Sequence, residues 1–346
     1  MNDIFISYII PCYNIQSYLP RCIDSLKNQV VPNMEVEFIL VNDGSVDNTL
    51  SVIQQFAQED DRVVVLNQEN QGVCAARNNA LSIARGIYVF FLDGDDFLSD
   101  DASEKFYYFC KDNLVDIVVA GNYKIYEDTG FVRSWGTPKK HIASGIYHKD
   151  QYVAQTKHLP VSCKFYRRDF LYANNIIFDK DLIVGEVYTF FIHSLTLAEK
   201  VGIMDDYVMY YLRRTVNSAT SSLNVSKDTA ILNTLHSIFG YVDTAYPILK
   251  QKKYFVAPVF FLATSFTILK YVSRTKFTPE IGSLITQIKK DKDYRDLLWY
   301  LTGRGFSFSR YTMLACAIRF LSPKMSYNLI RQYYRIASRN TQTLSE

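Results

Sequence analysis

Short apolar runs and longer segments with helical spacing alternate along the first 120 residues of the chain. The apolar runs are rich in β-branched residues and cover residues 4–10, 36–41, 63–66, 88–92 and 116–120. Between them, residues 17–29, 47–59, 72–85 and 99–113 repeat their apolar positions as one face of a helix does. This alternation predicts βαβ units and an α/β fold, with a mostly parallel twisted sheet flanked by helices.

The pattern changes further along the chain. Residues 124–222 form a loosely patterned region rich in Tyr, and helical periodicity returns after them and continues to the end. We therefore expect an α/β domain over residues 1–222 and a helical C-terminal extension over residues 223–346. The boundary is expected near residues 222–226, "SLNVS".

Charge and cysteine content exclude several classes of protein. Lys and Arg number 38 against 35 Asp and Glu, a net charge of +3, so no nucleic-acid partner is expected. The six cysteines are scattered without a CxxC pair, which favours free thiols in a reducing compartment over disulfides or a zinc site. The N-terminus lacks a signal-peptide pattern, and the apolar stretch 255–269 is shorter than the ~20 residues of a spanning helix. We expect a cytoplasmic protein.

Polar clusters follow three of the predicted strands. They read "PCYN" at residues 11–14, "NDGS" at 42–45 and "DGDD" at 93–96. Each cluster alone is also a good turn sequence, because Asn, Asp and Gly tolerate left-handed backbone. Ligands of parallel sheets bind beyond the carboxyl ends of the strands, so three polar clusters at this edge favour a binding site.

Asp93 and Asp95 directly follow an apolar strand and are separated by one glycine. Carboxylate oxygens in this arrangement suit Mg²⁺ or Mn²⁺, which bind one or two carboxylates together with substrate phosphates. The alternative is an acidic helix start, with Ser99 as N-cap and Asp100 and Asp101 in the first turn. That alternative explains Asp100 and Asp101 but not the pair before them.

Five motifs in order resemble those of an inverting family 2 glycosyltransferase with the GT-A fold. They read "IIPCYN", "VNDGS", "NQGVCAARNNAL", "FLDGDD" and "VGEVYTFF", and the resemblance covers residues 4–222. It implies transfer of a sugar from a UDP-sugar to a glycan or lipid-linked glycan acceptor, assisted by Mn²⁺ or Mg²⁺. It also implies a setting such as assembly of a bacterial capsule or O-antigen polysaccharide.

The resemblance assigns donor-binding roles to Pro11, Tyr13, Asp43, Arg77, Asp93, Arg213 and Arg214. Asp43 would accept a hydrogen bond from the uracil imide, in a base pocket lined by Pro11 and Tyr13 and supported by Arg77. Asp93 would contact the ribose, and Asp95, with Asp93, would hold the metal ion. Arg213 and Arg214 lie where relatives place a basic residue near the pyrophosphate, a role that suits the planar fork of arginine. The alternative for these two arginines is an exposed strand end.

The expected catalytic base is the point at which the sequence departs from the family. Relatives carry "GED" here and use its aspartate, whereas this chain has Val187 after Glu186. Glu186 becomes the candidate base, with Asp96 and Asp181 as substitutes. Val187 also keeps open a non-catalytic subunit that binds nucleotide-sugars or glycans. Nucleotidyl transfer ranks last, because its glycine-rich activating loop is missing.

The C-terminal segment, residues 301–345, contains no acidic residue but seven basic ones: Arg304, Arg310, Arg319, Lys324, Arg331, Arg335 and Arg339. Aromatic residues are interleaved with them. Such helices suit peripheral contact with an anionic membrane, here the inner face of the plasma membrane. A helical cap with solvated arginines explains the same pattern, and both interpretations stay open.

Overall fold

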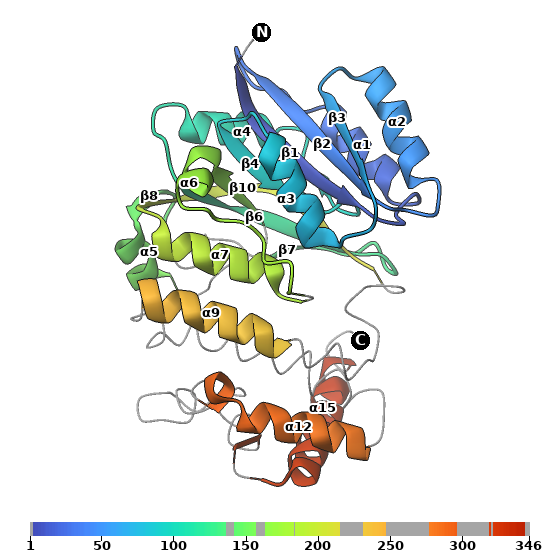
Figure 1. Ribbon diagram of the computed structural model, residues 1–346, viewed down its shortest axis with the longest axis vertical. Coiled ribbons are helices and arrows are strands. Elements are labelled where there is room, and N and C mark those ends of the chain that lie inside the picture. Colours follow the sequence, from blue (N-terminus) through green and yellow to red (C-terminus); the bar gives the residue numbers. More distant parts are fainter. Residues whose placement is uncertain are drawn as a thin grey trace. The chain divides into compact units, whose positions relative to one another are not determined.

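The computed structural model describes residues 3–135, 142–156, 163–182, 184–214, 231–246, 277–295, 318–319 and 321–342. The chain divides into two compact units, shown in Figure 1. The first consists of Met1–Lys180 and Phe190–Thr215, and the second of Asp181–Thr189 and Val216–Glu346. The boundary predicted at residues 222–226 lies outside the described residues.

The first unit is built on one ten-stranded sheet with the order β3-β2-β1-β4-β9-β6-β10-β5, to which β7 and β8 are added on β6 and β10. The strands are β1 (Ile4–Cys12), β2 (Glu35–Asp43), β3 (Val63–Gln68), β4 (Tyr88–Phe91), β5 (Phe97–Leu98), β6 (Ile117–Tyr126), β7 (Val132–Trp135), β8 (Gly145–His148), β9 (Lys164–Arg167) and β10 (Lys200–Arg213). The pairs β1–β2, β1–β4 and β2–β3 are parallel, as the sequence pattern predicted. The pair β6–β10 is parallel as well. Antiparallel β9 lies between β4 and β6, which makes the sheet mixed.

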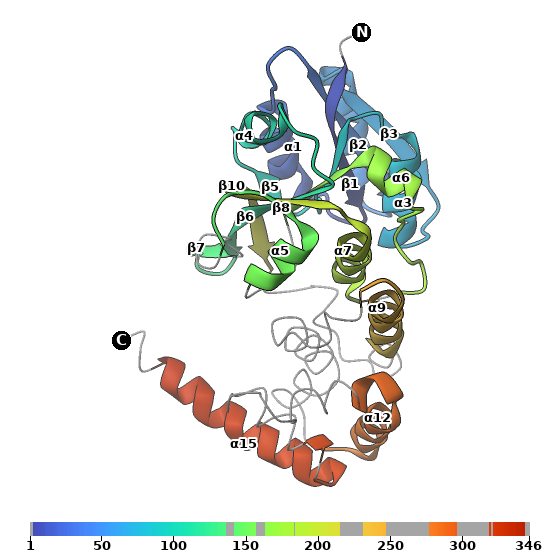
Figure 2. The same cartoon turned by 90° about the vertical axis from the view of Figure 1, so that its left-hand side faces the viewer.

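Helices cover both faces of this sheet. They are α1 (Leu19–Lys27), α2 (Thr49–Glu59), α3 (Val73–Ile83), α4 (Ala102–Cys110), α5 (Lys149–Gln155), α6 (Arg168–Ala173) and α7 (Glu186–Leu197). Figure 2 shows α1 and α4 on one side of β1, and α3 and α6 on the other. The α/β fold predicted from the sequence is therefore confirmed.

One predicted helix start is wrong. The chain stays extended through β5, which pairs with β10, and α4 begins only at Ala102 with Asp101 as its N-cap. The Ser99 hydroxyl instead donates a hydrogen bond to Oδ1 of Asp101, at 2.9 Å. Pairing of β5 with a distant strand thus overrides the local capping signal.

The aromatic residues fill the core of the first unit. The ring centroids of Phe106 from α4 and Phe165 from β9 are 3.7 Å apart and nearly parallel. Tyr88 meets Phe106 edge to face, with centroids 4.8 Å apart. Burial of each such side chain contributes about 1.5–3 kcal/mol, so these contacts fix the helices on the sheet that carries the polar clusters.

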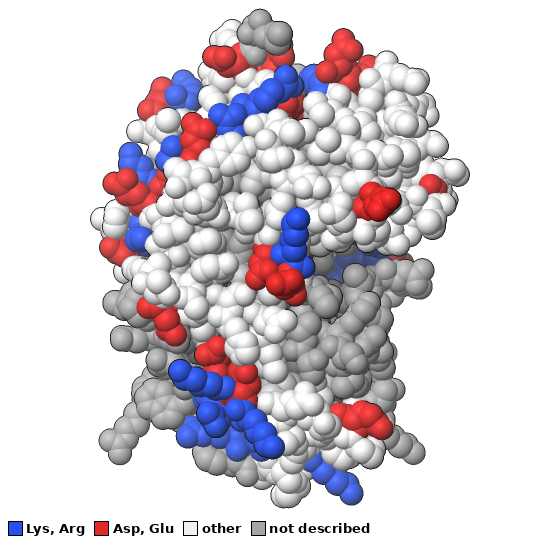
Figure 3. Space-filling model, viewed as in Figure 1, with Lys and Arg blue, Asp and Glu red and all other residues white. Residues whose placement is uncertain are grey.

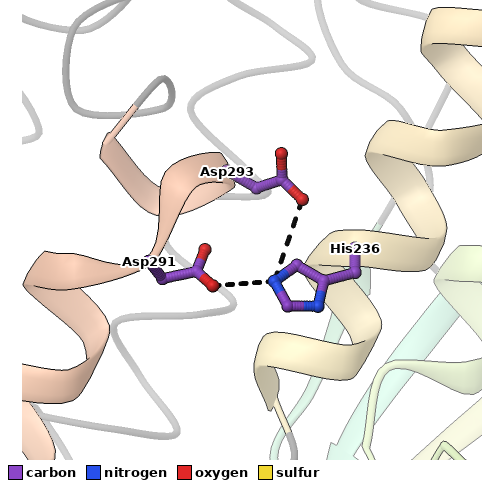
Figure 4. Close-up of side chains that lie close together, drawn as sticks. All are labelled: His236, Asp291 and Asp293. Carbon is purple, nitrogen blue, oxygen red and sulfur yellow. Dashed lines mark hydrogen bonds and ion pairs between the residues drawn. The ribbon is translucent and has the colours of Figure 1, made fainter.

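The described part of the second unit is helical, as predicted, and contains α9 (Ile231–Ala245), α12 (Pro279–Lys290) and α15 (Pro323–Gln342). Nε2 of His236, on α9, lies 2.7 Å from Oδ2 of Asp291 at the end of α12 (Figure 4). Asp293 lies 3.9 Å from the same nitrogen, and the other Asp291 oxygen accepts the N–H of Tyr294. Asp291 therefore both caps the next turn and ties α9 to α12.

The membrane interpretation of the C-terminal segment stays a prediction. No helix in the described part of the chain is both long and apolar enough to span a bilayer. The apolar stretch 255–269 and the basic positions 304 and 310 lie outside the described residues. On the face drawn in Figure 3, acidic and basic side chains lie interspersed among the coloured residues, in keeping with the nearly balanced charge.

Candidate active site

The three polar clusters meet at the carboxyl ends of β1, β2 and β4. The N–H of Asn14 donates to Oγ of Ser45, at 3.1 Å, and Oδ1 of Asn14 accepts the N–H of Val46, at 2.9 Å. A Cβ added at Gly94 would lie 2.4 Å from Cδ1 of Ile15 and 3.3 Å from the carbonyl oxygen of Pro11. The turn after β4 therefore packs closely against the end of β1, where a Cβ would displace the Ile15 side chain. The predicted convergence of the clusters is confirmed.

The turn after β2 also needs its glycine. Gly44 has φ +69°, in the left-handed region, and a Cβ there would lie 2.6 Å from the backbone nitrogen of Asn70. This close approach brings the segment that follows β3 against the end of β2. The segment leads into α3, which carries Arg77.

Asp43, at the end of β2, is buried and holds that segment. Its Oδ1 accepts hydrogen bonds from Nε2 of Gln68 and the N–H of Gln71, both at 2.8 Å. Its Oδ2 accepts the N–H of Gly72 at 2.9 Å. Since a carboxylate oxygen can accept two hydrogen bonds, Oδ2 can take one more from a ligand N–H.

The carboxylates after β4 form the centre of the site. Each of Asp93, Asp95 and Asp96 has an oxygen within 4.8 Å of the others. Nη2 of the buried Arg77 donates to Oδ1 of Asp93 at 2.7 Å, and Nη2 of Arg214 lies 2.5 Å from Oδ2 of Asp95. The sequence suggested neither ion pair, because α3 and the end of β10 reach these carboxylates only in the folded chain.

Burial and mutual repulsion shape the charge of this centre. Burial, followed by the negative charge of Asp93, raises the pKa of Asp95, while the guanidinium of Arg214 lowers it. Burial and then the charges of Asp95 and Asp93 raise the pKa of Asp96 well above its usual value. Crowded carboxylates of this kind are stabilised by a cation, and a hard divalent ion with oxygen ligands fits the donor set of Asp93 and Asp95.

Asp96 also has a clear structural contact. Its side chain is buried, and its Oδ1 accepts the N–H of Leu212 at 2.8 Å. This bond anchors β10 just before Arg214. The position favours an anchoring role, and the role of Asp96 as a substitute base stays a prediction.

The remaining donor-binding candidates lie near the same strand ends. Pro11 is half-buried at the end of β1, and Tyr13 is 49% exposed, so its ring is available as a wall for a planar ligand. The guanidinium carbon of Arg214 lies 4.7 Å from the centroid of the Tyr18 ring. The Tyr18 hydroxyl donates to Glu127 at 2.8 Å, which fixes the ring. Sequence reasoning missed Tyr18 and Glu127, because neither belongs to a motif.

The candidate base Glu186 opens α7 and is half-buried, with Val187 directly after it. Gly185, before it, has φ +75°, and its carbonyl accepts the N–H and hydroxyl of Thr189. Glu186 and the exposed Asp181 belong to the second unit. Their assignment as proton acceptors stays a prediction.

The chain is similar in sequence to known glycosyltransferases. A model of the family described as "Glycosyl transferase family 2" matches residues 7–173. The uncharacterized glycosyltransferase EpsJ of Bacillus subtilis is 33% identical over 222 residues, 62% of each chain. The poly(ribitol-phosphate) beta-glucosyltransferase of Bacillus spizizenii is 31% identical over 209 residues, 60% of this chain and 32% of that one. The present chain thus spans less than two thirds of either relative.

A solved structure shares the fold. Residues 1–349 of TarS from S. aureus, in complex with UDP-GlcNAc, superpose with a TM-score of 0.72 at 19% sequence identity. The match covers 96% of this chain and 92% of that one. At this identity the likeness supports the fold alone, and it confirms the predicted GT-A architecture.

Proposed function

The chain belongs to glycosyl transferase family 2 through its residues 7–173, and we propose that it transfers a sugar from a UDP-sugar to a glycan hydroxyl with inversion. One observation carries the proposal. Asp93 and Asp95 converge at the carboxyl end of β4, each paired with an arginine, where a parallel sheet binds its ligand. A diphosphate leaving group needs this combination of carboxylates for a metal ion and a guanidinium for its oxygens.

The nucleoside would bind at the ends of β1 and β2. Oδ2 of Asp43 has room for one more donor, which the imide N–H of uracil supplies. Tyr13 and Pro11 would cover the base, and Asp93 would contact the ribose. TarS, which shares the fold, binds UDP-GlcNAc, and this supports uridine as the nucleoside.

The diphosphate would lie against Asp95 and Arg214. A bound Mn²⁺ or Mg²⁺, held by Asp95 and Asp93, would neutralise negative charge on the departing UDP. Arg214 pairs with Asp95 in this structure, and its guanidinium would donate hydrogen bonds to the phosphate oxygens when the diphosphate binds. Arg77 would hold Asp93 in place from its buried position on α3.

The chemical step is a single displacement. The acceptor hydroxyl oxygen forms a bond to the anomeric carbon as the bond to the diphosphate oxygen breaks, and the configuration inverts. Glu186 would take the proton of the hydroxyl, because Val187 cannot accept one. The UDP leaves with the electron pair of the broken bond.

The setting would be assembly of a surface polysaccharide such as a capsule or O-antigen. The relatives include a poly(ribitol-phosphate) beta-glucosyltransferase, and lipid-linked glycans at the inner face of the plasma membrane are suitable acceptors. None of the five cysteines in the described part of the chain forms a disulfide bond. The second candidate is a non-catalytic nucleotide-sugar or glycan-binding subunit, which Val187 favours.

Release of UDP from UDP-GlcNAc, UDP-glucose and UDP-glucuronate, with Mn²⁺ and glycan acceptors, tests the proposal. The wild type should turn over at least one donor, and Asp95→Ala should abolish turnover while keeping its circular dichroism spectrum. Asp112→Ala removes an exposed carboxylate on α4's C-terminal side and should be as active as the wild type. Full activity of Asp95→Ala would refute the metal role, and binding without turnover would favour the non-catalytic subunit.

A further inference from the structure

Three cationic side chains gather on adjacent strands beside the candidate active site. We call Lys124 of β6, Arg133 of β7 and Arg213 of β10 the cationic cluster. Lys124 lies directly opposite Arg133 in the antiparallel β6–β7 pair. Arg213 lies opposite Tyr126, two residues beyond Lys124, in the parallel β6–β10 pair. The Cβ atoms of the opposite pair Lys124 and Arg133 are about 4.5–5.5 Å apart, and those of the diagonal pair Lys124 and Arg213 about 7–8 Å. Arg133 and Arg213 flank Lys124 from the two sides of β6.

The electrostatics of the cluster favour a bound anion. Burial, followed by the charges of Arg213 and Arg133, lowers the pKa of Lys124 to about 8. Like charges opposite each other across strands repel one another. Lys124 is 8% exposed, whereas Arg133 and Arg213 are exposed and accessible to a ligand. An anion would relieve the repulsion.

Tyr211 connects the cluster with the carboxylates. Nζ of Lys124 lies 5.7 Å from the centroid of the Tyr211 ring. Burial, and then the charges of Asp96, Asp93 and Asp95, raise the pKa of Tyr211 to about 12. The ring lies beside Lys124, and Arg213 directly precedes Arg214, which pairs with Asp95, so the cluster adjoins the carboxylates. An anion on the cluster would be close to the site of sugar transfer without replacing Arg214, which pairs with Asp95.

We propose that Lys124, Arg133 and Arg213 bind an anionic group, a phosphate or a carboxylate, of the glycan acceptor. This inference rests on the proposed function and names the substrate class of its acceptor site. The two exposed arginines would donate paired hydrogen bonds to the anion, and Lys124 would supply a charge behind them. The Tyr211 and Tyr126 rings, each 5.7 Å from Nζ of Lys124, would hold the ammonium in place.

Binding of defined oligomers tests the proposal, with the full chain saturated in UDP and Mn²⁺. The probes are a poly(glycerol phosphate) oligomer, a hyaluronan hexasaccharide and a neutral dextran oligomer of similar length. At least one anionic probe should bind the wild type tenfold or more tightly than dextran does, with an affinity that falls as salt rises. Arg133→Glu, on an exposed position, should weaken that binding by about tenfold or more and leave dextran unchanged.

Lys111→Glu is the matched control, because it reverses one exposed charge at the end of α4. An equal loss in this variant would mean that total charge drives binding, which overturns the proposal. A loss of UDP affinity in Arg133→Glu, with anionic probes unaffected, would assign the cluster to the donor diphosphate and also overturn it. If neither anionic probe binds the wild type, the proposal is likewise overturned. Failure of the wild type to bind UDP would instead contradict the proposed function.

Discussion

Removal of Arg214 should change two affinities in opposite directions. Arg214 lies on the same Asp95 carboxylate that would hold the metal ion, so the guanidinium and the cation compete when no nucleotide is bound. With a diphosphate present, the same guanidinium would bind phosphate oxygens and assist the metal. Arg214→Ala should therefore bind Mn²⁺ alone more tightly and Mn²⁺-UDP more weakly than the wild type.

The structure sets the size of both effects. At an effective dielectric constant near 20, unit charges 4 Å apart attract by about 4 kcal/mol before the cost of desolvation. The Arg214 and Asp95 side chains are 21% and 17% exposed, so we discount the pair to about 1–2 kcal/mol. This corresponds to roughly a 5- to 30-fold gain in Mn²⁺ affinity. Loss of a charged hydrogen bond to the diphosphate costs about 1.5–3 kcal/mol, or roughly a 10- to 150-fold loss for UDP.

Electron paramagnetic resonance measures free Mn²⁺ directly, and isothermal titration calorimetry measures UDP binding at saturating Mn²⁺. Arg213→Ala is the matched control for the Mn²⁺ measurement, because Arg213 is the exposed neighbour of Arg214 and lies outside the ion pair with Asp95. Its Mn²⁺ affinity should equal that of the wild type. Weaker Mn²⁺ binding by Arg214→Ala in the absence of UDP would refute the competition, and unchanged UDP affinity would refute the diphosphate role.

Four further variants test the site and its scaffold. Gly44→Ala places a Cβ 2.6 Å from the backbone nitrogen of Asn70 at a positive φ, and it should lower the free energy of unfolding, measured in urea titrations, by about 2–4 kcal/mol. Gly72→Ala, at φ +87° but with open space around the new Cβ, should lower the free energy of unfolding by only about 1–2 kcal/mol. Equal costs would contradict the close approach. Burial lowers the pKa of Lys164 from 10.5 to about 7, so between these values the unfolded chain binds more protons and stability should rise with pH by up to about 1.4 kcal/mol per unit. Lys164→Met should lack that rise between pH 7 and 9, and parallel pH profiles would show that Lys164 stays charged. Glu186→Gln should reduce transfer by about 10²- to 10⁴-fold with UDP affinity unchanged, and a normal rate would place the base elsewhere.

The sequence predicted the parallel half of the sheet well because local signals and the fold agree there. The β-branched runs at residues 4–10 and 36–41 became β1 and β2, and both are buried on two faces. Such strands read as continuous apolar runs, and the helices between them carry periodic apolar positions. The polar residues at their ends stood out against this background, which is why the clusters could be placed at one edge.

The antiparallel additions could not be predicted in the same way. The strand β9 has four residues and lies between β4 and β6, although it follows both in sequence. Nothing within Lys164–Arg167 encodes those partners, since pairing depends on contacts made by the whole sheet. The Ser99 interpretation failed for the same reason, because β5 pairs with β10, about 110 residues away.

The ion pairs of the site could not be predicted from the sequence either. Arg77 is buried on α3, and its pairing with Asp93 depends on how α3 packs against the sheet. Arg214 reaches Asp95 because pairing with β6 and the bond from the N–H of Leu212 to Asp96 hold the end of β10. The residue types predict a diphosphate site, but the partners of each carboxylate depend on tertiary structure.

Thermal stability with UDP, GDP and dTDP, each with and without Mn²⁺, tests the central claim most directly. A ligand at about 100 times its dissociation constant adds roughly 2.7 kcal/mol to the folded state, enough to raise Tm by several degrees. We predict a Mn²⁺-dependent rise with UDP that Asp95→Ala abolishes. No rise with any of the three nucleotides would mean that the carboxylates after β4 do not hold a metal ion against a diphosphate.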